Sequence, residues 1–295
     1  MRRLLIGLLM LAVLPRCASA DDVVKVSMYS WALRSGGNLR PYYLALLHEA
    51  LERTRPDYGA YQVQTFTEET SLARVIQLAI AGSRINVLPT GVGEPGPERE
   101  MIPVPFPIDK GLLGYRVALI DRRSQLRLSR VQNIEDLRRL RVGQGSDWSD
   151  VPIYQHDRIP ITTTPDEGLL VLMLMHGRFD LFPRGLYEVA PEMAAYGKQY
   201  PDLAVEQHLL LHYPFCEAFY VSRSDPRLAA RLTAGLNRMV ADGSFDALFA
   251  RYLGAPLGAL HLRQRILIEI DNPYLPAWVP IRRRELWFDP ARQMR

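Results

Sequence analysis

Short segments of strand-forming residues alternate with segments whose apolar residues recur at helical spacing along this 295-residue chain. In residues 41–54, Leu44, Leu47 and Leu51 share one helical face, and the flanking segments 23–29 and 61–66 are typical of strands. The same alternation continues to Gly254 and predicts an α/β protein with helices on the faces of its sheets. The further strands that it predicts are residues 85–88, 115–120, 141–143, 179–182 and 218–222.

Capping residues and prolines indicate where these elements begin and end. Thr67 is the expected cap of the helix after the second strand. Thr164, followed three residues later by Glu167, predicts another helix start with a capping box. We expect Pro89 and Pro183 to end the strands before them, because proline has no N–H to donate to a sheet.

The N-terminus has the pattern of a secretory signal peptide. Arg2 and Arg3 precede an apolar run over residues 4–14, and small residues follow at positions 18–20. The alternative is a membrane anchor, which needs about 18–20 apolar residues, more than this run contains. We therefore expect cleavage after Ala20 and a periplasmic mature protein.

The charge balance does not indicate a nucleic-acid partner. The formal net charge of +4 falls to +1 when Arg2, Arg3 and Arg16 leave with the signal peptide. Nucleic-acid-binding proteins concentrate positive charge in patches or stripes. Cys216 is the only cysteine of the mature chain, so burial rather than an internal disulfide must stabilise the fold.

Motifs for catalysis or for metal binding do not appear in the sequence. The six histidines are scattered, and no Cys/His cluster has the spacing of a metal site. A nucleophile elbow and a phosphate-binding loop are absent as well. We expect no metal, no cofactor and no catalytic residue.

The order of several short motifs resembles a known family, the extracellular solute-binding proteins of family 3. These proteins have the type II periplasmic-binding-protein fold and commonly serve polar amino-acid ABC transporters. The similar segments are ER at 98–99, PFP at 105–107, IEDL at 134–137, VGQGS at 142–146, GRFD at 177–180, MVADGS at 239–244 and RYLG at 251–254.

The resemblance implies two α/β lobes with a ligand cleft between them. The first lobe would comprise residues 21–112 and 213–254, and the second residues 113–212, with crossings near 110–114 and 211–216. Residues 255–295 exceed a minimal family member. Their aromatic residues favour packing on the first lobe, and residues 266–270 suit a strand or a short helix.

Two segments match positions where family members contact the ligand. Arg99 aligns with the arginine that grips a ligand carboxylate, although a surface ion pair with a neighbouring glutamate is the alternative. Gly145, Ser146, Asp147 and Trp148 follow a predicted strand and are expected to open a helix, whose free N–H groups would bind an anion. Asp147, if it faces the cleft, would instead bind a cationic group.

The segment after the strand at 179–182 departs from the family pattern. Members that bind free amino acids usually have an aspartate where this chain has Gly185, and here Arg184 stands beside it. A second arginine in the cleft would favour an anionic ligand.

The remaining candidates lie at the ends of first-lobe strands. Tyr29 and Trp31 match a position where the family has an aromatic residue over the ligand, and Trp148 is a further aromatic candidate. Thr90 and Gly91 could offer a hydroxyl and backbone groups.

Together these features predict a monomeric solute-binding protein that closes on a small anionic or amino-acid-like ligand, expected to bear a carboxylate. It would present this ligand to a membrane permease such as that of an ABC importer. A sensory protein that signals to a membrane kinase or cyclase is the alternative. A dehydratase-like enzyme is the second, and Glu167 or Glu188 would then supply the acid.

Overall fold

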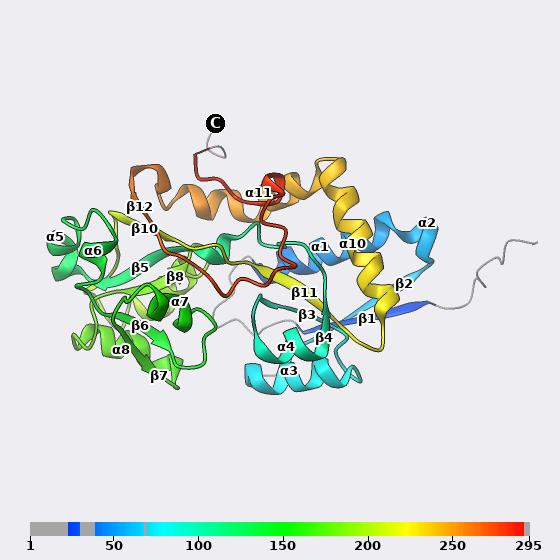
Figure 1. Ribbon diagram of the computed structural model, residues 1–295, viewed down its shortest axis with the longest axis horizontal. Coiled ribbons are helices and arrows are strands. Elements are labelled where there is room, and N and C mark those ends of the chain that lie inside the picture. Colours follow the sequence, from blue (N-terminus) through cyan, green and yellow to red (C-terminus); the bar gives the residue numbers. More distant parts are fainter. Residues whose placement is uncertain (1–22, 30–38, 68–69, 292–295) are drawn as a thin grey trace, which may run out of the picture.

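The computed structural model describes residues 23–29, 39–67 and 70–291. The signal peptide and Trp31 lie outside these residues. Within them, two five-stranded sheets and one two-stranded sheet form two lobes that lie side by side (Figure 1). The two-lobed α/β fold predicted above is thereby confirmed.

The first lobe is built on a five-stranded sheet of order β2-β1-β3-β11-β4. β1 and β2 pair in parallel along their whole length, from Val24 opposite Tyr61 to Tyr29 opposite Phe66. Helices α1, α10 and α11 pack on one face and α3 and α4 on the other (Figure 1). The elements are β1 (Val24–Tyr29), α1 (Leu39–Arg53), α2 (Arg55–Tyr58), β2 (Tyr61–Phe66), α3 (Leu72–Ala81), β3 (Val87–Gly91), α4 (Pro95–Glu100), β4 (Met101–Pro103), β11 (Glu217–Ser222), α10 (Pro226–Ala241) and α11 (Ser244–Gly258).

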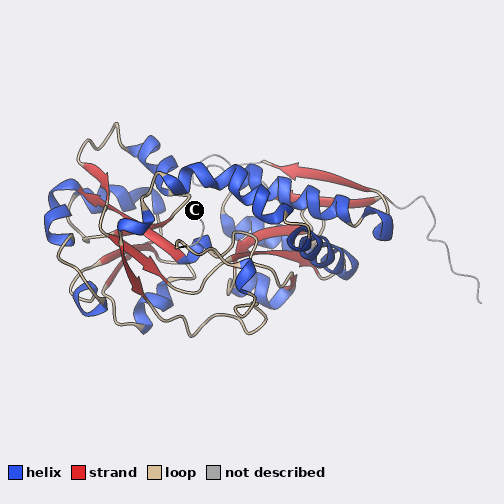
Figure 2. Ribbon diagram, turned by 90° about the horizontal axis from the view of Figure 1, so that it is seen from above, coloured by secondary structure: helices blue, strands red, loops and turns tan. Residues whose placement is uncertain are grey.

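The second lobe contains a sheet of order β12-β10-β5-β8, with β9 also paired to β5, and a separate parallel pair, β6-β7. A bridge between Val142 and Leu181 joins the pair to the larger sheet. Short helices enclose these strands (Figure 2). The elements are β5 (Tyr115–Asp121), α5 (Gln125–Leu128), α6 (Ile134–Leu137), β6 (Val142–Gly145), α7 (Val151–His156), β7 (Ile161–Thr164), α8 (Leu170–Met175), β8 (Phe182–Gly185), α9 (Val189–Tyr196), β9 (Leu203–Val205), β10 (Leu209–His212) and β12 (Ile266–Glu269).

Two crossings connect the lobes, one between β4 and β5 and one between β10 and β11. They touch each other, since the Tyr213 N–H donates to the Gly114 carbonyl oxygen over 3.1 Å. A Cβ at Gly114 would lie 2.1 Å from the Tyr213 carbonyl oxygen, so only glycine allows this contact. The close contact holds the two crossing segments together, and we call these segments the hinge.

The C-terminal extension contacts both lobes, whereas the sequence indicated the first lobe alone. β12 joins the second-lobe sheet through parallel pairing with β10, because residues 266–269 form a strand that covers its free edge. Further on, the Trp278 Nε1–H donates to Glu98 Oε2 of the first lobe over 3.1 Å, and the Phe288 N–H donates to the Lys110 carbonyl oxygen at the hinge. The extension thus makes a third connection between the lobes.

Several expected element ends were wrong. Ser71 rather than Thr67 caps α3, with its hydroxyl accepting from the Arg74 N–H. Asp166 rather than Thr164 caps the next turn, where a 3₁₀ segment precedes α8. These caps differ because a serine and an aspartate nearer to the first helical turn have the suitable geometry.

Both prolines lie inside strands rather than after them. Pro89 is the central residue of β3 and stands opposite Phe219 of β11. The Val92 N–H donates to the Cys216 carbonyl oxygen, and hydrogen-bonded residue pairs alternate with non-hydrogen-bonded pairs along an antiparallel ladder. Pro89, three residues before Val92, is therefore in a non-hydrogen-bonded pair and needs no N–H toward β11. Pro183 similarly lies within β8.

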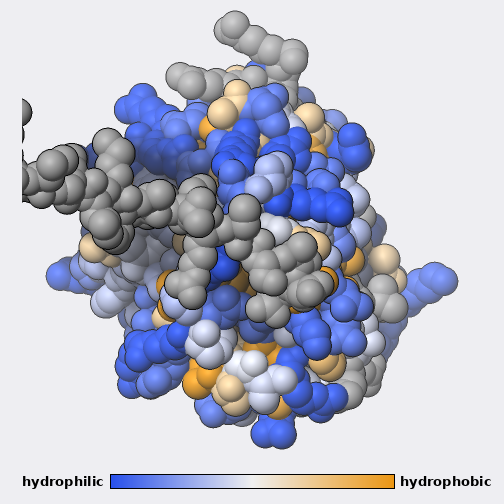
Figure 3. All heavy atoms as spheres, turned by 90° about the vertical axis from the view of Figure 1, so that its right-hand side faces the viewer, coloured by the Kyte–Doolittle hydropathy of each residue, from blue (hydrophilic) through white to orange (hydrophobic). Residues whose placement is uncertain are grey.

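No helix in the described part of the chain is long and apolar enough to cross a membrane. The outer end of the first lobe is mostly hydrophilic, with only scattered hydrophobic side chains in view (Figure 3).

Candidate functional site

A cavity of about 270 Å³ lies between the lobes, next to the hinge. Its walls include the ends of β1 and β3 in the first lobe and the segments that follow β6 and β8 in the second. The volume is close to the lower end of the range for small-molecule sites, roughly 300–1,000 Å³. The cavity is therefore large enough for a small solute.

The charged lining of this cavity is predominantly acidic. Six described residues contribute carboxyl groups and two contribute guanidinium groups, so carboxyl groups exceed cations by four. The first lobe supplies Glu94 and Glu217, and the second supplies Asp147, Asp150, Glu167, Glu188, Arg116 and Arg184.

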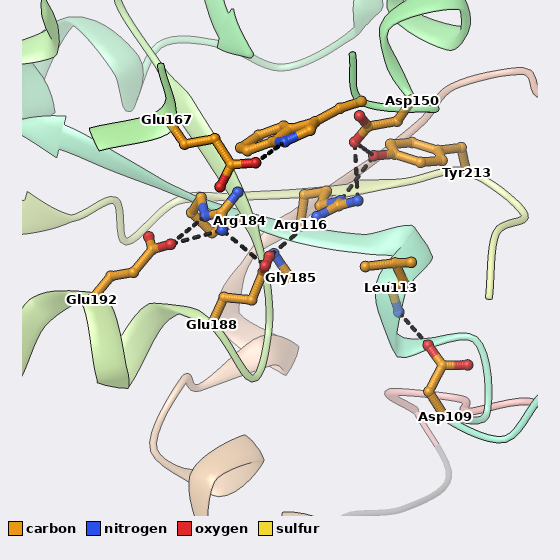
Figure 4. A network of polar contacts seen from close by, with 11 residues as sticks. Asp109, Leu113, Arg116, Asp150, Glu167, Arg184, Gly185, Glu188, Glu192 and Tyr213 are labelled. Carbon is orange, nitrogen blue, oxygen red and sulfur yellow. Dashed lines mark hydrogen bonds and ion pairs between the residues drawn. The ribbon is translucent and has the colours of Figure 1, made fainter. Parts of the chain in front are cut away.

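Arg184 forms buried ion pairs within the protein (Figure 4). Its Nε donates to Glu192 Oε1 over 2.7 Å, and its Nη2 donates to Glu188 Oε1 over 2.8 Å. Burial raises the pKa of Glu192 to about 7, although Arg184 acts in the opposite direction. Of the three guanidinium nitrogens of Arg184, only Nη1 has no such bond to another described residue. Arg184 therefore offers at most this one nitrogen to an anionic ligand.

Trp148 forms an aromatic wall beside Arg184. Its ring stacks on Phe182 with centroids 6.2 Å apart, and the guanidinium carbon of Arg184 lies 4.8 Å from the Trp148 ring centre. The indole Nε1–H donates to Glu167 Oε1 over 2.8 Å, which fixes the orientation of the ring (Figure 4). A cationic group of a ligand could stack on such a ring in the same way as Arg184.

Arg116 is held by three partners and was not recognised from the sequence. From β5, its Nη2 donates to Asp150 Oδ2 over 2.9 Å, its Nε to the Tyr213 hydroxyl over 2.8 Å, and its Nη1 to Glu188 Oε2 over 3.4 Å (Figure 4). All three nitrogens are thus engaged. A lone arginine in an otherwise apolar strand was the signal that could have identified it.

The first-lobe side of the cavity contains two further residues that the sequence did not reveal, Glu217 and Tyr43. Glu217 is the first residue of β11, and burial raises its pKa to about 8, with the charge of Asp109 adding to the shift. The Tyr43 hydroxyl faces Glu217 and makes no hydrogen bond of ordinary geometry among the described residues. Glu217 directly follows the second crossing, which was the available signal.

Six of the ten predicted site residues line the cavity. They are Tyr29, Thr90, Gly91, Asp147, Trp148 and Arg184. Trp31 lies outside the described residues, and the other three do not line the cavity.

Arg99 lies on the surface rather than in the cleft. Its Nε donates to the Pro95 carbonyl oxygen of its own helix over 3.1 Å, and the side chain is exposed. Glu98 occupies the inward face of α4 instead, where its Oε1 accepts from the Gly93 N–H and the Tyr220 hydroxyl. Since adjacent helical residues point about 100° apart, Arg99 faces away.

The anion site expected at Gly145 and Ser146 does not form. The Ser146 N–H donates to the Thr164 carbonyl oxygen and extends the β6-β7 pairing, and α7 begins only at Val151. Gly145 acts indirectly, because the Trp148 indole occupies the space of a side chain there, with Nε1 2.5 Å from an ideal Cβ. Glycine therefore allows Trp148 to fold over this strand end.

Across residues 23–29, 39–67 and 70–291, no group of three or more His, Cys, Asp or Glu side chains is arranged to hold a metal ion. Cys216 is buried, and burial raises the pKa of its thiol well above its usual range.

Comparison with known proteins identifies the fold. No protein-family model matches the chain, and no curated protein matches it by sequence. Among solved structures, it is similar to an ancestral arginine-binding protein bound to arginine (TM-score 0.51, 14% identity, 78% of this chain and 98% of that one). It is also similar to the VFT2 domain of BvgS from Bordetella pertussis (0.53, 16%, 78% and 93%) and to a histidine kinase sensor domain that resembles periplasmic binding proteins (0.50, 16%, 80% and 98%). The chain therefore has the two-lobed fold of type II periplasmic binding proteins, as the resemblance predicted.

Proposed function

We propose that this chain is a periplasmic solute-binding protein that closes on a small ligand bearing a positively charged group. The acidic lining of the interlobe cavity is the observation that supports this ligand class. Arg116 and Arg184 are occupied by Asp150, Glu188 and Glu192, and Arg99 is outside the cavity, so the anionic ligand expected from the sequence finds few free donors.

Trp148 and the carboxyl groups fit such a ligand in complementary ways. An ammonium or guanidinium group gains from stacking on the indole face and from the surrounding negative charge. An amino acid with a basic side chain, or a small polyamine, meets both conditions. The Nη1 atom of Arg184 remains for a carboxylate if the ligand carries one.

Closure of the lobes would couple binding to a change of shape that a membrane partner can recognise. We propose an importer as this partner, in line with the resemblance to transporter-associated proteins. A sensory role is the alternative, since the same fold occurs in a histidine kinase sensor domain. Uptake of a labelled ligand that depends on this chain would support import.

We further propose that the ligand leaves chemically unchanged. Glu167 and Glu188, the candidate acids of a dehydratase-like enzyme, line the cavity, but Glu167 is bonded to Trp148 and Glu188 to both arginines. Recovery of each bound compound intact after long incubation is the expected result, and turnover of any of them would exclude this part of the proposal.

A thermal-shift screen of residues 21–295 tests the ligand class. The cationic compounds are L-arginine, L-lysine, agmatine and putrescine, and the comparison set is L-glutamate, succinate and L-glutamine. A ligand at 100 times its Kd adds about 2.7 kcal/mol of stability, which raises Tm by roughly 5–10 °C for a chain of this size. We expect such a shift with at least one cationic compound and none with the dicarboxylates.

Two variants check that the shift arises in the cavity. Trp148→Ala should reduce it strongly, whereas Arg99→Ala should leave it unchanged, because Arg99 is exposed and outside the cavity. A shift with succinate or L-glutamate alone, lost in Arg184→Met, would overturn the cationic assignment.

A further inference from the structure

Glu217 is the acid at the hinge end of the cavity, and it has neither an ion pair nor an indole partner to compensate its charge. Asp150 and Glu188 are each bonded to an arginine, and Glu167 accepts from the Trp148 indole. Among the described residues, no lysine, arginine or histidine forms an ion pair with Glu217. A positive partner for this carboxyl group has to come from the ligand.

The side chains around Glu217 leave room for a hydrogen-bond donor of a ligand. Tyr43 is only 6% exposed, lines the cavity, and its hydroxyl faces Glu217 without another hydrogen-bond partner among the described residues. Glu217 is thus the one group among the described residues that can pair with this buried hydroxyl, and a buried polar atom whose hydrogen bonding is incomplete beside a cavity indicates a place for a ligand group.

Asp109 provides a negative charge behind Glu217 and Tyr43 at neutral pH, since burial raises its pKa only to about 6. It is fully buried, and its carboxyl group accepts from the backbone N–H groups of Gly111, Leu113 and Glu217 over 3.0, 2.8 and 3.1 Å. These bonds hold it in the hinge, where it cannot reach the cavity itself. Its charge increases the attraction of the site for a cation.

We propose that Glu217 and the Tyr43 hydroxyl receive the cationic group of the ligand at the hinge end of the cavity, and that Glu217 releases a proton as this group binds. This inference rests on the proposed function. In the step, the O–H bond of the Glu217 carboxyl group breaks and its proton passes to solvent. The resulting carboxylate then accepts N–H hydrogen bonds from the ligand.

The charges around Glu217 support this exchange. Burial raises its pKa to about 8, Asp109 and Glu188 act in the same direction, and Tyr43 and Arg116 act against them. Tyr187 also faces Glu217, but burial raises the pKa of its hydroxyl well above the usual range, so it stays neutral. In the empty cleft at neutral pH, Glu217 is therefore mostly protonated, and a cation in contact favours the ionised form.

Titration calorimetry with L-arginine and agmatine, in buffers of different ionisation enthalpy, measures the number of protons released per bound ligand. We expect release of about 0.9 proton per bound molecule at pH 7, decreasing toward zero above pH 9. Affinity should rise about tenfold per unit between pH 6 and 7 and level off above pH 8, because the ligand binds the ionised form.

Three variants locate the proton. Glu217→Gln should abolish the release and the pH dependence, and should weaken binding at pH 8 by about 10–100-fold. Asp147→Asn, at an exposed carboxyl group on the cavity rim, should keep the release. Tyr43→Phe should bind several-fold more weakly and shift the pH dependence upward, because the hydroxyl lowers the pKa of Glu217.

The outcomes separate this inference from the proposed function. If neither compound binds and the wider cationic screen is also negative, the proposed function fails. If the wild-type protein binds without proton release, only the inference fails, whether or not Glu217→Gln folds. Burial also raises the pKa of Glu94, so loss of the release in Glu94→Gln but not in Glu217→Gln would assign the proton to the rim and overturn the inference.

Discussion

The guanidinium carbon of Arg184 lies 4.8 Å from the centre of the Trp148 ring, so the buried cation of the second lobe also supports the aromatic wall of the cavity. Arg184 is in turn fixed by Glu188 and Glu192. The shape of the cavity on this side therefore depends on an ion-pair network that is complete without a ligand.

Replacement of Arg184 by methionine should destabilise the protein strongly. The variant leaves Glu192 and Glu188 without their main cation in a buried setting, and breaking a buried pair costs about 3–5 kcal/mol. Urea unfolding measures this loss. Arg127→Met is the control, since it removes a half-exposed pair with Asp180 and should cost less than about 1 kcal/mol. Equal effects of the two variants would contradict the structural role.

The α/β architecture and most strands could be predicted because they depend on local patterns of apolar residues. The strand 61–66 was predicted with its observed ends. The capping residues were harder to predict, since Ser71 and Thr67 both suit the role and only the geometry of the first turn decides between them.

The cavity could be predicted only in part, because its character depends on contacts between distant segments. Arg184 and Trp148 were found from single positions. The partners of Arg184 are close in sequence, but the turn after β8 decides that they face it, and the partners of Arg116 lie 34 to 97 residues away. Without these contacts, Arg99 and Arg184 suggested an anionic ligand. Glu217 gained significance only when the fold placed Asp109 and Tyr43 beside it.

The ligand-free protein should lose stability as pH rises from about 5 to 8. Burial raises the pKa of Asp109 to about 6, of Glu192 to about 7 and of Glu217 to about 8. The native state then binds more protons than the unfolded chain, so this stability is present at low pH and is lost as pH rises through these values. Each group contributes a slope of at most about 1.4 kcal/mol per pH unit.

Urea unfolding between pH 5 and 9 tests this dependence. Glu217→Gln should flatten the part near pH 8, while Glu52→Gln, at an exposed surface residue, should leave the profile as it is. A stability that rises over this interval in the wild-type protein would show that these carboxyl groups are ionised throughout.

Gly145→Ala should displace Trp148 and weaken ligand binding. The added Cβ would lie 2.5 Å from the indole Nε1, so the ring must move away from its place over Arg184 and lose its bond to Glu167. Overpacking of this kind costs about 1–3 kcal/mol. Tryptophan fluorescence and the thermal shift with L-arginine report the change. Gly254→Ala, where nothing lies within 4 Å, should have little effect on either.

Trp278 anchors the C-terminal extension on the first lobe, and its removal should loosen the third connection between the lobes. Its ring packs edge-on against Tyr220, and its Nε1–H donates to Glu98. Trp278→Ala should cost about 1–3 kcal/mol and increase hydrogen exchange in residues 271–291, while β12 stays protected by its pairing with β10. Trp278→Phe keeps the packing and loses only the hydrogen bond, so it should cost about 1 kcal/mol. Unchanged exchange in Trp278→Ala would mean that the hinge contacts of Phe288 alone hold the extension.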